Sequence, residues 1–463
     1  MKNLSPRARA LLDALHAAPG LVERPRGERE PRREALLLAL GERREPGLVL
    51  PVFELLWSAR DGEPRALAIA LHQLVTHLGP EDVRGVDEAL RRASLSATNY
   101  LDLRPEHLAD FAALSPSVVA LLTCHPDGYV REAALTRLSA SGNVTAWPFL
   151  LVRLNDWVGV VREAARHAVT AALPHVPLEQ LARHFALVEA LRRLQRADHA
   201  PFVDAVLARL RQPDALAWLE AHLDTLDRPA RRTAFQLLLQ GPDAAARRVT
   251  ERGLEDGDGR VQRLALERVE ALFVGDALPP LLVRMERSRS MPVRREAYAL
   301  YARRVPDLGE AKVREALLDR HPAVRDFAQR RLAGRVDFVA LYREALQHEP
   351  VRPGALAGLG EVGRAPEASL VRPFVRDARL AVRREAVAAL GKLAEEERDA
   401  ALLREGFLDP ETAVRKAATQ ALERRSGRFS AEWLRGCILS LAEDAHHLKR
   451  ALQLTAHLSR FDA

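Results

Sequence analysis

Apolar residues recur along this chain in segments of one kind. In each, an aliphatic residue is followed by Ala four positions later and by another apolar residue eight positions later. The segments begin at Val130, Val161, Ala230, Val261, Val293, Val324, Val351, Val382 and Val414. Positions four apart lie on one face of an α-helix. Each segment is therefore predicted to be an amphipathic helix that buries this stripe.

The segments return at a nearly constant interval. Most starts are 31 or 32 residues apart, with a step of 27 before Val351 and one of 69 between Val161 and Ala230. Weaker copies open at Pro31 and Pro64, and Leu448 continues the phase. A second apolar stretch precedes each segment, and turn residues separate the two. Each unit is thus a predicted helical hairpin that buries its apolar face only by stacking on its neighbours.

The predicted fold is all-α: an α-solenoid, with a right-handed superhelix of about 13–14 stacked helical hairpins. Residues 1–30 are predicted to form an N-terminal cap or flexible segment, 31–428 the repeat solenoid, and 429–463 a capping hairpin. The repeat is irregular at 93–117 and at 175–225. The first of these is either a polar insertion that serves as a contact point or a degenerate repeat.

The stretch from Asp409 to Leu422 carries the resemblance to a known family. It nearly reproduces the order Asp-Pro, Val-Arg, Ala, Leu and resembles HEAT repeats, with the short period of compact HEAT-like proteins such as phycobilisome lyases. The resemblance covers most of residues 31–460. It is specific for a solenoid fold and implies little about function.

An arginine follows the aliphatic residue in eight of the nine segments, with Gln262 as the exception. The resemblance implies that these arginines join successive repeats in a ladder with acidic residues that also cap the helices. The ladder is predicted to comprise Arg131, Arg162, Arg231, Arg294, Arg325, Arg383 and Arg415, with Asp127, Asp156 and Asp258. The alternative is a basic ribbon that faces a polyanion; we favour the ladder because paired, partly buried arginine is a common structural arrangement.

The next position faces solvent, about 200° from the buried stripe. It is Glu in the segments at Val130 and Val161, and the later segments carry Arg232, Arg263, Arg295, Arg384 and Lys416. The resemblance places this second helix on the concave surface of the solenoid. These cations are therefore candidates for binding a protein partner or nucleic-acid phosphates. A solvated helix face in an arginine-rich chain is the alternative.

Composition changes this picture only a little. The chain has 463 residues, 48% apolar and 29% charged, and a net charge of +7. Only five of its 70 basic residues are lysine, a bias typical of a GC-rich coding sequence, so the charge is weak evidence for nucleic acid. Two cysteines exclude a disulfide framework and a Cys-based zinc site. Without a long apolar run or a secretion signal, we expect a cytoplasmic protein and no membrane partner.

Catalytic and cofactor motifs are missing. The sequence contains no HExxH, Gly-x-Ser-x-Gly or Walker pattern, and the Gly-rich stretch 358–363 lies inside a helical repeat. Cys124 stands beside His125, which does not establish a nucleophile and base. We therefore expect no enzyme, metal, cofactor or small-molecule substrate.

One enzyme alternative resembles the alkylpurine DNA glycosylases built from HEAT-like repeats. Asp156 and Trp157 would form its site, with Tyr129, Trp147 or Trp218 as stacking partners. The paired-Trp signature of those enzymes is absent, and their chains are much shorter. This alternative requires a deep pocket around Asp156 and Trp157.

The leading hypothesis is a non-catalytic scaffold that binds a protein partner along its concave surface. The alternative is a solenoid that binds nucleic acid through an Arg-rich groove, and a glycosylase is the third possibility.

Overall fold

The structure of the chain is a computed structural model that describes residues 4–17, 31–59, 63–92, 98–142, 144–424, 429–440 and 445–458. All regular elements in these ranges are helices, and none is a strand. The prediction of an all-α solenoid is confirmed. The contacts divide the chain into two compact units, Met1–Val249 and Thr250–Ala463.

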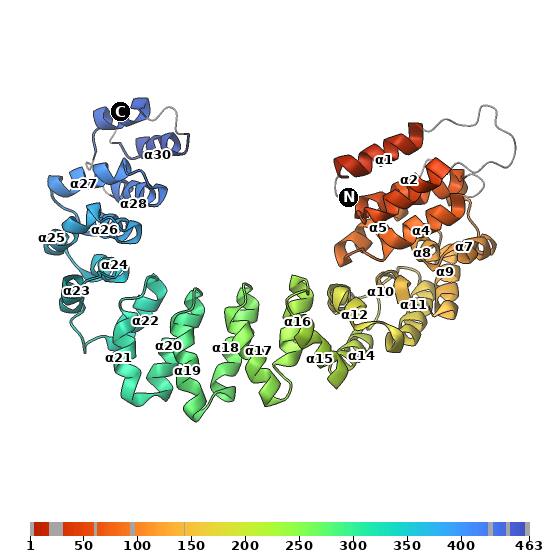
Figure 1. Cartoon of the computed structure of the whole chain (residues 1–463), viewed down its shortest axis with the longest axis horizontal. Helices are drawn as coiled ribbons and strands as arrows, with labels where there is room; N and C mark the ends of the chain where they lie inside the picture. Colours follow the sequence, from red (N-terminus) through yellow and green to blue (C-terminus); the bar gives the residue numbers. More distant parts are fainter. Residues whose placement is uncertain are drawn as a thin grey trace. The chain divides into compact units, whose positions relative to one another are not determined.

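Helices of the first unit form successive layers along the chain (Figure 1). They are α1 (Pro6–Ala17), α2 (Pro31–Glu42), α3 (Val49–Glu54), α4 (Glu63–Val75), α5 (Pro80–Arg92), α6 (Thr98–Leu101), α7 (Leu108–Leu114), α8 (Pro116–Leu122), α9 (Gly128–Ser141), α10 (Trp147–Arg153), α11 (Gly159–Ala172), α12 (Leu178–Arg183), α13 (Phe185–Leu191), α14 (Ala200–Leu210), α15 (Pro213–His222) and α16 (Arg228–Leu238).

The helix α17 (Asp243–Glu255) contains the division, and the second unit continues as regular hairpins. Its helices are α18 (Gly259–Leu272), α19 (Leu278–Glu286), α20 (Met291–Arg304), α21 (Pro306–Ala316), α22 (Pro322–Leu332), α23 (Phe338–Gln347), α24 (Pro353–Val362), α25 (Ala368–Val371), α26 (Leu380–Leu393), α27 (Glu397–Phe407), α28 (Thr412–Glu423), α29 (Ala431–Ser440) and α30 (Ala445–Thr455). Short 3-10 helices lie at Pro46–Leu48, Leu55–Ser58, Pro105–His107, Val144–Ala146, Leu173–His175, Gly275–Ala277, Ala365–Glu367 and Arg372–Arg376.

The predicted stripe is the core of the repeats. Its aliphatic, Ala and apolar positions are at most 4% exposed in all nine segments. One helix boundary differs from the prediction: Val351 is buried but precedes α24, which begins at Pro353. Proline fits the first helical position and disfavours helical backbone in the residue before it, so Arg352 becomes the N-cap.

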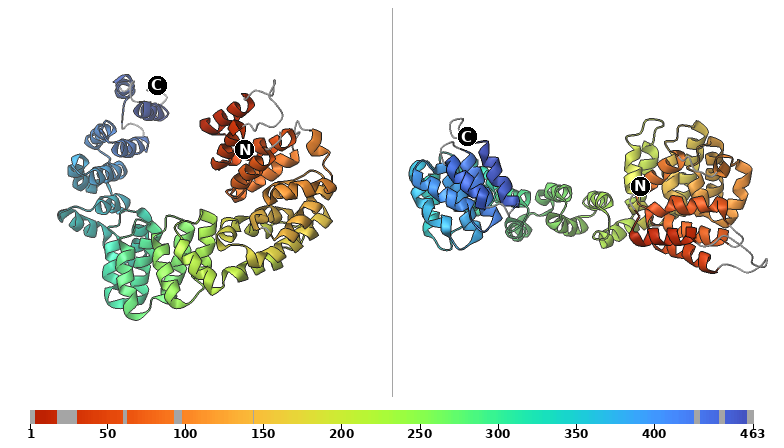
Figure 2. Two further views of the ribbon diagram at one scale, coloured as in Figure 1. Left: turned by 45° about the vertical axis from the view of Figure 1, so that its right-hand side comes forward. Right: turned by 90° about the horizontal axis from the view of Figure 1, so that it is seen from above.

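Second helices of neighbouring hairpins pack closely in the second unit. Helix α26 lies between α24 and α28, and Figure 2 shows this side-by-side stacking in two further orientations. A Cβ atom at Gly360 would lie 2.7 Å from the Cα atom of Ala389, and one at Gly391 would overlap Ala421. Gly360, in the stretch 358–363, and Gly391 therefore allow the helices to pack closely, since a larger residue would force them apart.

The two regions predicted to be irregular contain helices where the structure describes them, and their irregularity stays a prediction. The described part of 93–117 contains α6 and α7, and Tyr100 there is fully buried between the rings of Phe53, Trp57 and His125. Tyr100, Leu103 and Leu108 are buried while most of their neighbours are exposed, so Tyr100 is not a surface contact. In the second region, α12 to α15 follow one another as short helices.

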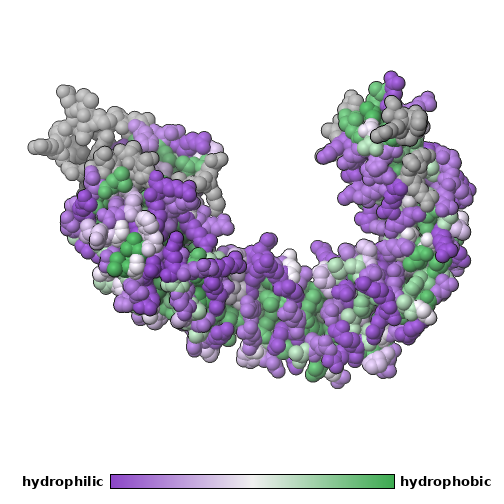
Figure 3. Space-filling model, turned by 180° about the vertical axis from the view of Figure 1, so that it is seen from behind, coloured by the Kyte–Doolittle hydropathy of each residue, from purple (hydrophilic) through white to green (hydrophobic). Residues whose placement is uncertain are grey.

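The predicted domain limits lie outside the described residues, at 18–30 and 425–428, and stay predictions. Within the described ranges, α1 precedes the first repeat, and Trp433 of α29 packs its ring 5.5 Å from that of Phe407. No helix of the described residues has the length and apolarity needed to span a membrane. On the face drawn in Figure 3, hydrophilic residues predominate and hydrophobic ones form small patches.

Candidate functional site

Arginines at the predicted ladder position hold adjacent hairpins together in a repeated geometry. One guanidinium nitrogen, Nη1, donates to a backbone carbonyl in the turn that precedes its own helix. In six arginines the acceptor is the backbone oxygen of the residue six positions earlier. The pairs are Arg131 with His125, Arg162 with Asp156, Arg294 with Ser288, Arg325 with Asp319, Arg383 with Asp377, and Arg415 with Asp409. Other nitrogens of Arg131, Arg294, Arg325 and Arg383 reach a carboxylate of the following hairpin.

In the second unit these nitrogens bind a carboxylate of the following hairpin. Arg294 donates to Asp319 at 2.7 and 2.9 Å, and Arg383 donates to Asp409 at 2.7 Å. Arg325 reaches Glu361 at the end of α24, at 3.0 Å from Nε. Glu361 takes the place of an acid in the turn, since the residue five positions before Val351 is Leu346. These charge-assisted bonds couple successive hairpins in addition to their apolar contacts.

The acids predicted for the ladder lie at two different spacings before the aliphatic position. Asp319 and Asp409, like Asp156, lie five residues before the aliphatic position and accept a backbone N–H two residues on. Asp127 and Asp258 lie three residues before it and cap helices α9 and α18 through the N–H groups of Tyr129 and Arg260. Acid residues at two spacings therefore perform two separate tasks. Arg231 is half-buried in α16.

One junction of the second unit replaces the charged pair by neutral groups. Gln262 keeps the carbonyl contact, with Nε2 2.7 Å from the oxygen of Asp256, and its Oε1 accepts from Ser290 at 2.7 Å. Ser288 occupies the position that Asp319 holds one repeat later and accepts from the N–H of Ser290. A hollow of about 740 Å³ lies beside this junction, over Leu254 and Met285.

In the first unit, several arginines converge on the single carboxylate of Asp156. It accepts from Arg91, Arg131 and Arg153 at 2.8, 3.0 and 3.0 Å, and from the N–H of Val158 at 3.0 Å. The side chains of Arg131 and Asp156 are fully buried. A second carboxylate, Asp87 on α5, bonds Arg91 at 3.1 Å and also pairs with Arg153. Three guanidinium groups therefore share two carboxylates.

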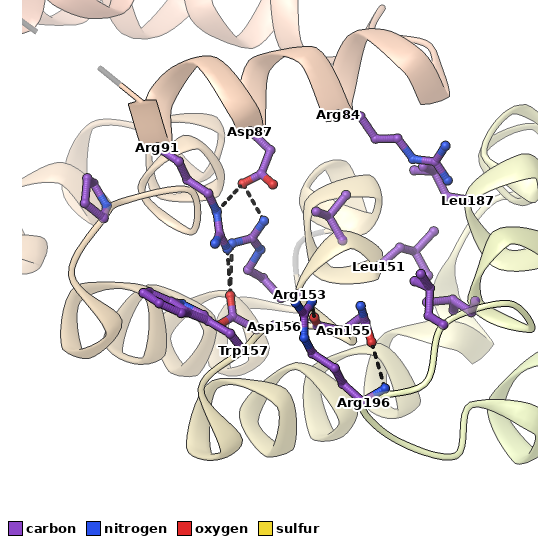
Figure 4. A pocket seen from close by; sticks show the side chains of 14 residues that line it. Arg84, Asp87, Arg91, Leu151, Arg153, Asn155, Asp156, Trp157, Leu187 and Arg196 are labelled. Atoms are coloured by element: carbon purple, nitrogen blue, oxygen red, sulfur yellow. Dashed lines mark hydrogen bonds and ion pairs between the residues drawn. The ribbon is translucent and has the colours of Figure 1, made fainter. Parts of the chain in front are cut away.

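A cleft of about 610 Å³ opens beside this network (Figure 4). We call it the α5–α13 cleft. Helix α5 provides Arg84, Asp87 and Arg91, and the turn before α9 provides Pro126. Six residues between Leu151 and Trp157 come from α10 and its following turn, and the four residues from Leu187 to Arg196 come from α13 and its following turn. The lining residues are Arg84, Asp87, Arg91, Pro126, Leu151, Val152, Arg153, Asn155, Asp156, Trp157, Leu187, Leu191, Leu194 and Arg196.

The cleft forms where α5, and α13 from the second irregular region, pack against the regular hairpin α10–α11. Helix α5, which precedes the first irregular region, packs against α10, and α13 from the second packs on the other side. Figure 4 shows Arg84 pointing toward Leu187 across the cleft, with Asp156 and Trp157 below α5. A uniform stack of repeats would have brought one kind of helix to this face and left no such combination.

The chemistry of the α5–α13 cleft combines cations with an apolar wall. Arg196 bonds only the amide and backbone oxygens of Asn155, and neither Arg84 nor Arg196 has an ion pair among the described residues. Leu187 and Leu191 form a buried wall, while Leu194 is 39% and Trp157 65% exposed. Four arginines and two aspartates line the cleft, so its charge is positive. Such a surface attracts a carboxylate next to a large apolar group.

The groups proposed for glycosylase chemistry do not fit that role in this structure. The pocket around Asp156 and Trp157 that this alternative requires is present, but the oxygens of Asp156 already accept four hydrogen bonds from groups within the protein. Trp147 is fully buried, and the ring of Trp218 stacks on His222 at 4.2 Å. Tyr129 is exposed, as Trp157 is.

Cys124 and His125 do not form a catalytic pair either. The Cys124 thiol is buried, and burial together with the nearby Asp87 raises its pKa well above the ordinary value. Burial lowers the pKa of His125, whose Nε2 lies 2.7 Å from the oxygen of Tyr100 and whose Nδ1 accepts from the N–H of Asp127. Among the described residues no cluster of three or more His, Cys, Asp or Glu side chains is arranged to hold a metal.

The predicted cationic stripe does not form one uniform surface. Arg232 lies half-buried in the first unit. In the second unit, Arg263 faces Glu267 at 3.8 Å, Arg384 bonds Glu385 at 2.9 Å, and Arg295 lies over the ring of Phe327 at 5.7 Å. Lys416 is exposed and lines a polar groove. The surroundings of Lys416 thus differ from those of Arg263, Arg295 and Arg384, each of which has an acidic or aromatic neighbour.

Sequence reasoning missed most of the cleft. Asp87 and Arg91 stand four apart on a helix, and Arg153 stands three before Asp156, spacings that indicate local ion pairs. Neither spacing shows that α5 lies against α10, because their pairing joins residues 65 apart in the sequence. The Asp that recurs five residues before the aliphatic position could have predicted the acids of the ladder from the sequence.

Comparison with known proteins identifies part of this repeat array. The profile of the family HEAT repeats matches residues 339–423, from α23 to α28, which confirms the predicted HEAT repeats. No curated protein matches the chain.

Solved structures with a similar arrangement of helices include forms of the karyopherin Kap121p. The complex with the extreme C-terminus of the protein phosphatase Cdc14p is 14% identical with a TM-score of 0.34, and covers 98% of this chain and 57% of that one. The complex of Kap121p with Nup53p is 13% identical with a TM-score of 0.32, and covers 97% and 57%. This chain therefore spans less than two thirds of the length of these proteins.

Proposed function

We propose that the protein is a non-catalytic HEAT-repeat scaffold that binds a protein partner, and that the α5–α13 cleft holds a segment of this partner. The segment carries a large apolar side chain next to an acidic residue. The observation that carries the proposal is the pairing of Arg84 and Arg196, which lack carboxylate partners within the described residues, with the wall of Leu187, Leu191 and Leu194.

Charge complementarity selects the acidic residue of this partner. The buried network behind the cleft contains three guanidinium groups and two carboxylates, so it adds positive potential to that of Arg84 and Arg196. A carboxylate that enters the cleft meets cations whose hydrogen-bonding groups are partly held in place by Asp87, Asp156 and Asn155. Pre-organised donors lose little conformational entropy on binding, which favours affinity.

The large apolar side chain of the partner segment would contact Trp157 and the leucine wall of the cleft. Trp157 is largely exposed at the edge of the cleft, and an exposed Trp next to a pocket is a common energetic centre of protein interfaces. This location differs from the concave surface suggested by the sequence, because the described cations of that surface in the second unit have acidic or aromatic neighbours at three of four positions.

A displayed library of random peptides tests the proposal on the full chain. We expect enriched peptides to share an Asp or Glu beside Leu, Phe or Trp. Arg84→Glu with Arg196→Glu, and separately Trp157→Ala with Leu194→Ala, are expected to weaken their binding by about 10- to 100-fold. All four side chains are exposed, so the variants keep the fold.

Matched controls use exposed residues of the same unit outside the cleft. Arg211→Glu with Arg247→Glu changes the net charge equally, and Leu101→Ala removes a half-exposed apolar side chain. These variants are expected to bind the peptides like the wild type. Enriched peptides without acidic residues, or binding that survives both cleft variants, would contradict the proposal.

A further inference from the structure

A groove between α28 and α30, near the C-terminal end of the second unit, has a chemistry opposite to that of the α5–α13 cleft. Its volume is about 800 Å³, and no apolar side chain lines it. The lining residues are Thr412, Arg415, Lys416, Thr419, Gln420, Glu423, Lys449, Arg450 and Gln453. We call it the α28–α30 groove.

Hydrogen-bond donors and positive charges dominate this groove. Four of its side chains are cationic and one, Glu423, is acidic. Among the described residues no salt bridge joins Lys416, Lys449 or Arg450 to a carboxylate, whereas Arg263 and Arg384 on the preceding second helices have acidic neighbours. The amides of Gln420 and Gln453 and the hydroxyl of Thr412 add neutral donors. Such a surface favours an anion rich in acceptor oxygens.

The type of cation supports the same conclusion. The chain has five lysines among 70 basic residues, and two of the five, Lys416 and Lys449, line this groove. A lysine ammonium is a compact charge on a flexible stem, which follows phosphates at varied positions without the fixed geometry that an arginine pair requires. Arg415 is held in place by its bonds to the oxygen of Pro410 and to the hydroxyl of Thr412.

We propose that the α28–α30 groove binds the phosphate backbone of a nucleic-acid duplex. The lining offers no apolar anchor of the kind that a peptide segment uses at an interface core. It also offers no aromatic side chain on which an unpaired base would stack, which disfavours a single strand. Backbone phosphates need only the cations and neutral donors that the groove provides. This activity is separate from the protein partner proposed above.

Fluorescence anisotropy of the full chain with a labelled duplex of about 20 base pairs tests this site. The variant Lys416→Glu, Lys449→Glu, Arg450→Glu is expected to lose at least about tenfold in affinity at 50 mM salt. The slope of log affinity against log salt concentration should become shallower by about 2.7, since each phosphate contact contributes about 0.9.

A control variant carries the same change of charge elsewhere on the second unit. Arg260→Glu, Arg331→Glu and Arg398→Glu reverse three exposed cations outside the groove and are expected to reduce the affinity less than about threefold. Circular dichroism on both variants confirms that the helices are retained. An equal loss in the two variants would show that net charge, and not the groove, determines binding.

Two competitors distinguish the ligand. A polyglutamate peptide that binds more tightly than the duplex and loses its binding in the groove variant would overturn the assignment in favour of an acidic protein segment. A single strand that competes better than the duplex would overturn the preference for duplex. Because peptides that bind the α5–α13 cleft should bind the groove variant unchanged, failure of one proposal leaves the other testable.

Discussion

In the stack from α20 to α28, Arg294, Arg325 and Arg383 each bind one carboxylate of a neighbouring hairpin, whereas in the first unit Arg91, Arg131 and Arg153 share Asp156 and Asp87. Each of these three pairs in the second unit is neutral. The network of the first unit has one more guanidinium group than carboxylates and lies beside the α5–α13 cleft. The packing of α5 and α13 against α10 places this unbalanced network beside the cleft that we propose as a binding site.

The cost of an unpaired charge differs between the two regions. Asp156 holds three guanidinium groups in a fully buried position, while Asp319 holds Arg294 alone. Removing a carboxylate leaves its arginines desolvated without compensation, and the penalty grows with their number and burial. This difference is the basis of the first prediction.

Asp156→Ala is expected to have the largest effect on stability. It leaves the buried Arg131 and Arg153 without this partner and should lower the free energy of unfolding by about 3–5 kcal/mol. Asp319→Ala releases one arginine and should cost about 1.5–3 kcal/mol. Urea unfolding of the full chain, followed by far-UV circular dichroism, measures both. Equal costs would mean that Asp87 compensates for the lost carboxylate within the network.

Completing the neutral rung of the second unit is expected to have a smaller effect of the opposite sign. Gln262→Arg with Ser288→Asp recreates the arrangement of Arg294 and Asp319 one repeat earlier, and Asp at 288 can still accept the N–H of Ser290. The double variant should gain about 1 kcal/mol beyond the sum of the single variants. A double-mutant cycle by urea unfolding measures this coupling. A coupling of zero would show that the hollow over Met285 prevents the pair from forming.

The pH dependence of stability is expected to show the smallest difference, with opposite signs in the two regions. Burial opposes ionisation of Asp319, but hydrogen bonds from Arg294 and from the N–H of His321 lower its pKa below the ordinary value near 3.8. Its contribution to stability is therefore present above that value and is lost as the pH falls through the lower, folded pKa.

For Asp87, burial raises the pKa despite the opposing effect of Arg91. The folded state then binds a proton at a higher pH than the unfolded state, so this contribution is fully present below 3.8 and is lost as the pH rises through the folded pKa. The difference in unfolding free energy between wild type and Asp319→Asn should shrink on acidification, and that between wild type and Asp87→Asn should shift in favour of the wild type. Parallel pH curves for both variants would contradict the two assignments.

The amino-acid sequence determined the repeat unit and its core. Local periodicity specifies which face of each helix is buried, and a hairpin with one apolar face has to stack, so the stripe positions such as Val382, Ala386 and Leu390 were predictable. The N-cap of Asp127 was likewise predictable, because capping depends on neighbours in the chain.

Only the tertiary structure decided how the charged groups are used. The partners of Asp156 include Arg91, 65 residues away, and the cleft combines side chains of α5, α10 and α13 that no periodic pattern brings together. The groove around Lys416 likewise depends on α30, whereas the acidic neighbours of Arg263 and Arg384 lie on their own helices. Electrostatic function depends on which charges meet in space, whereas burial in a repeat depends mainly on local period.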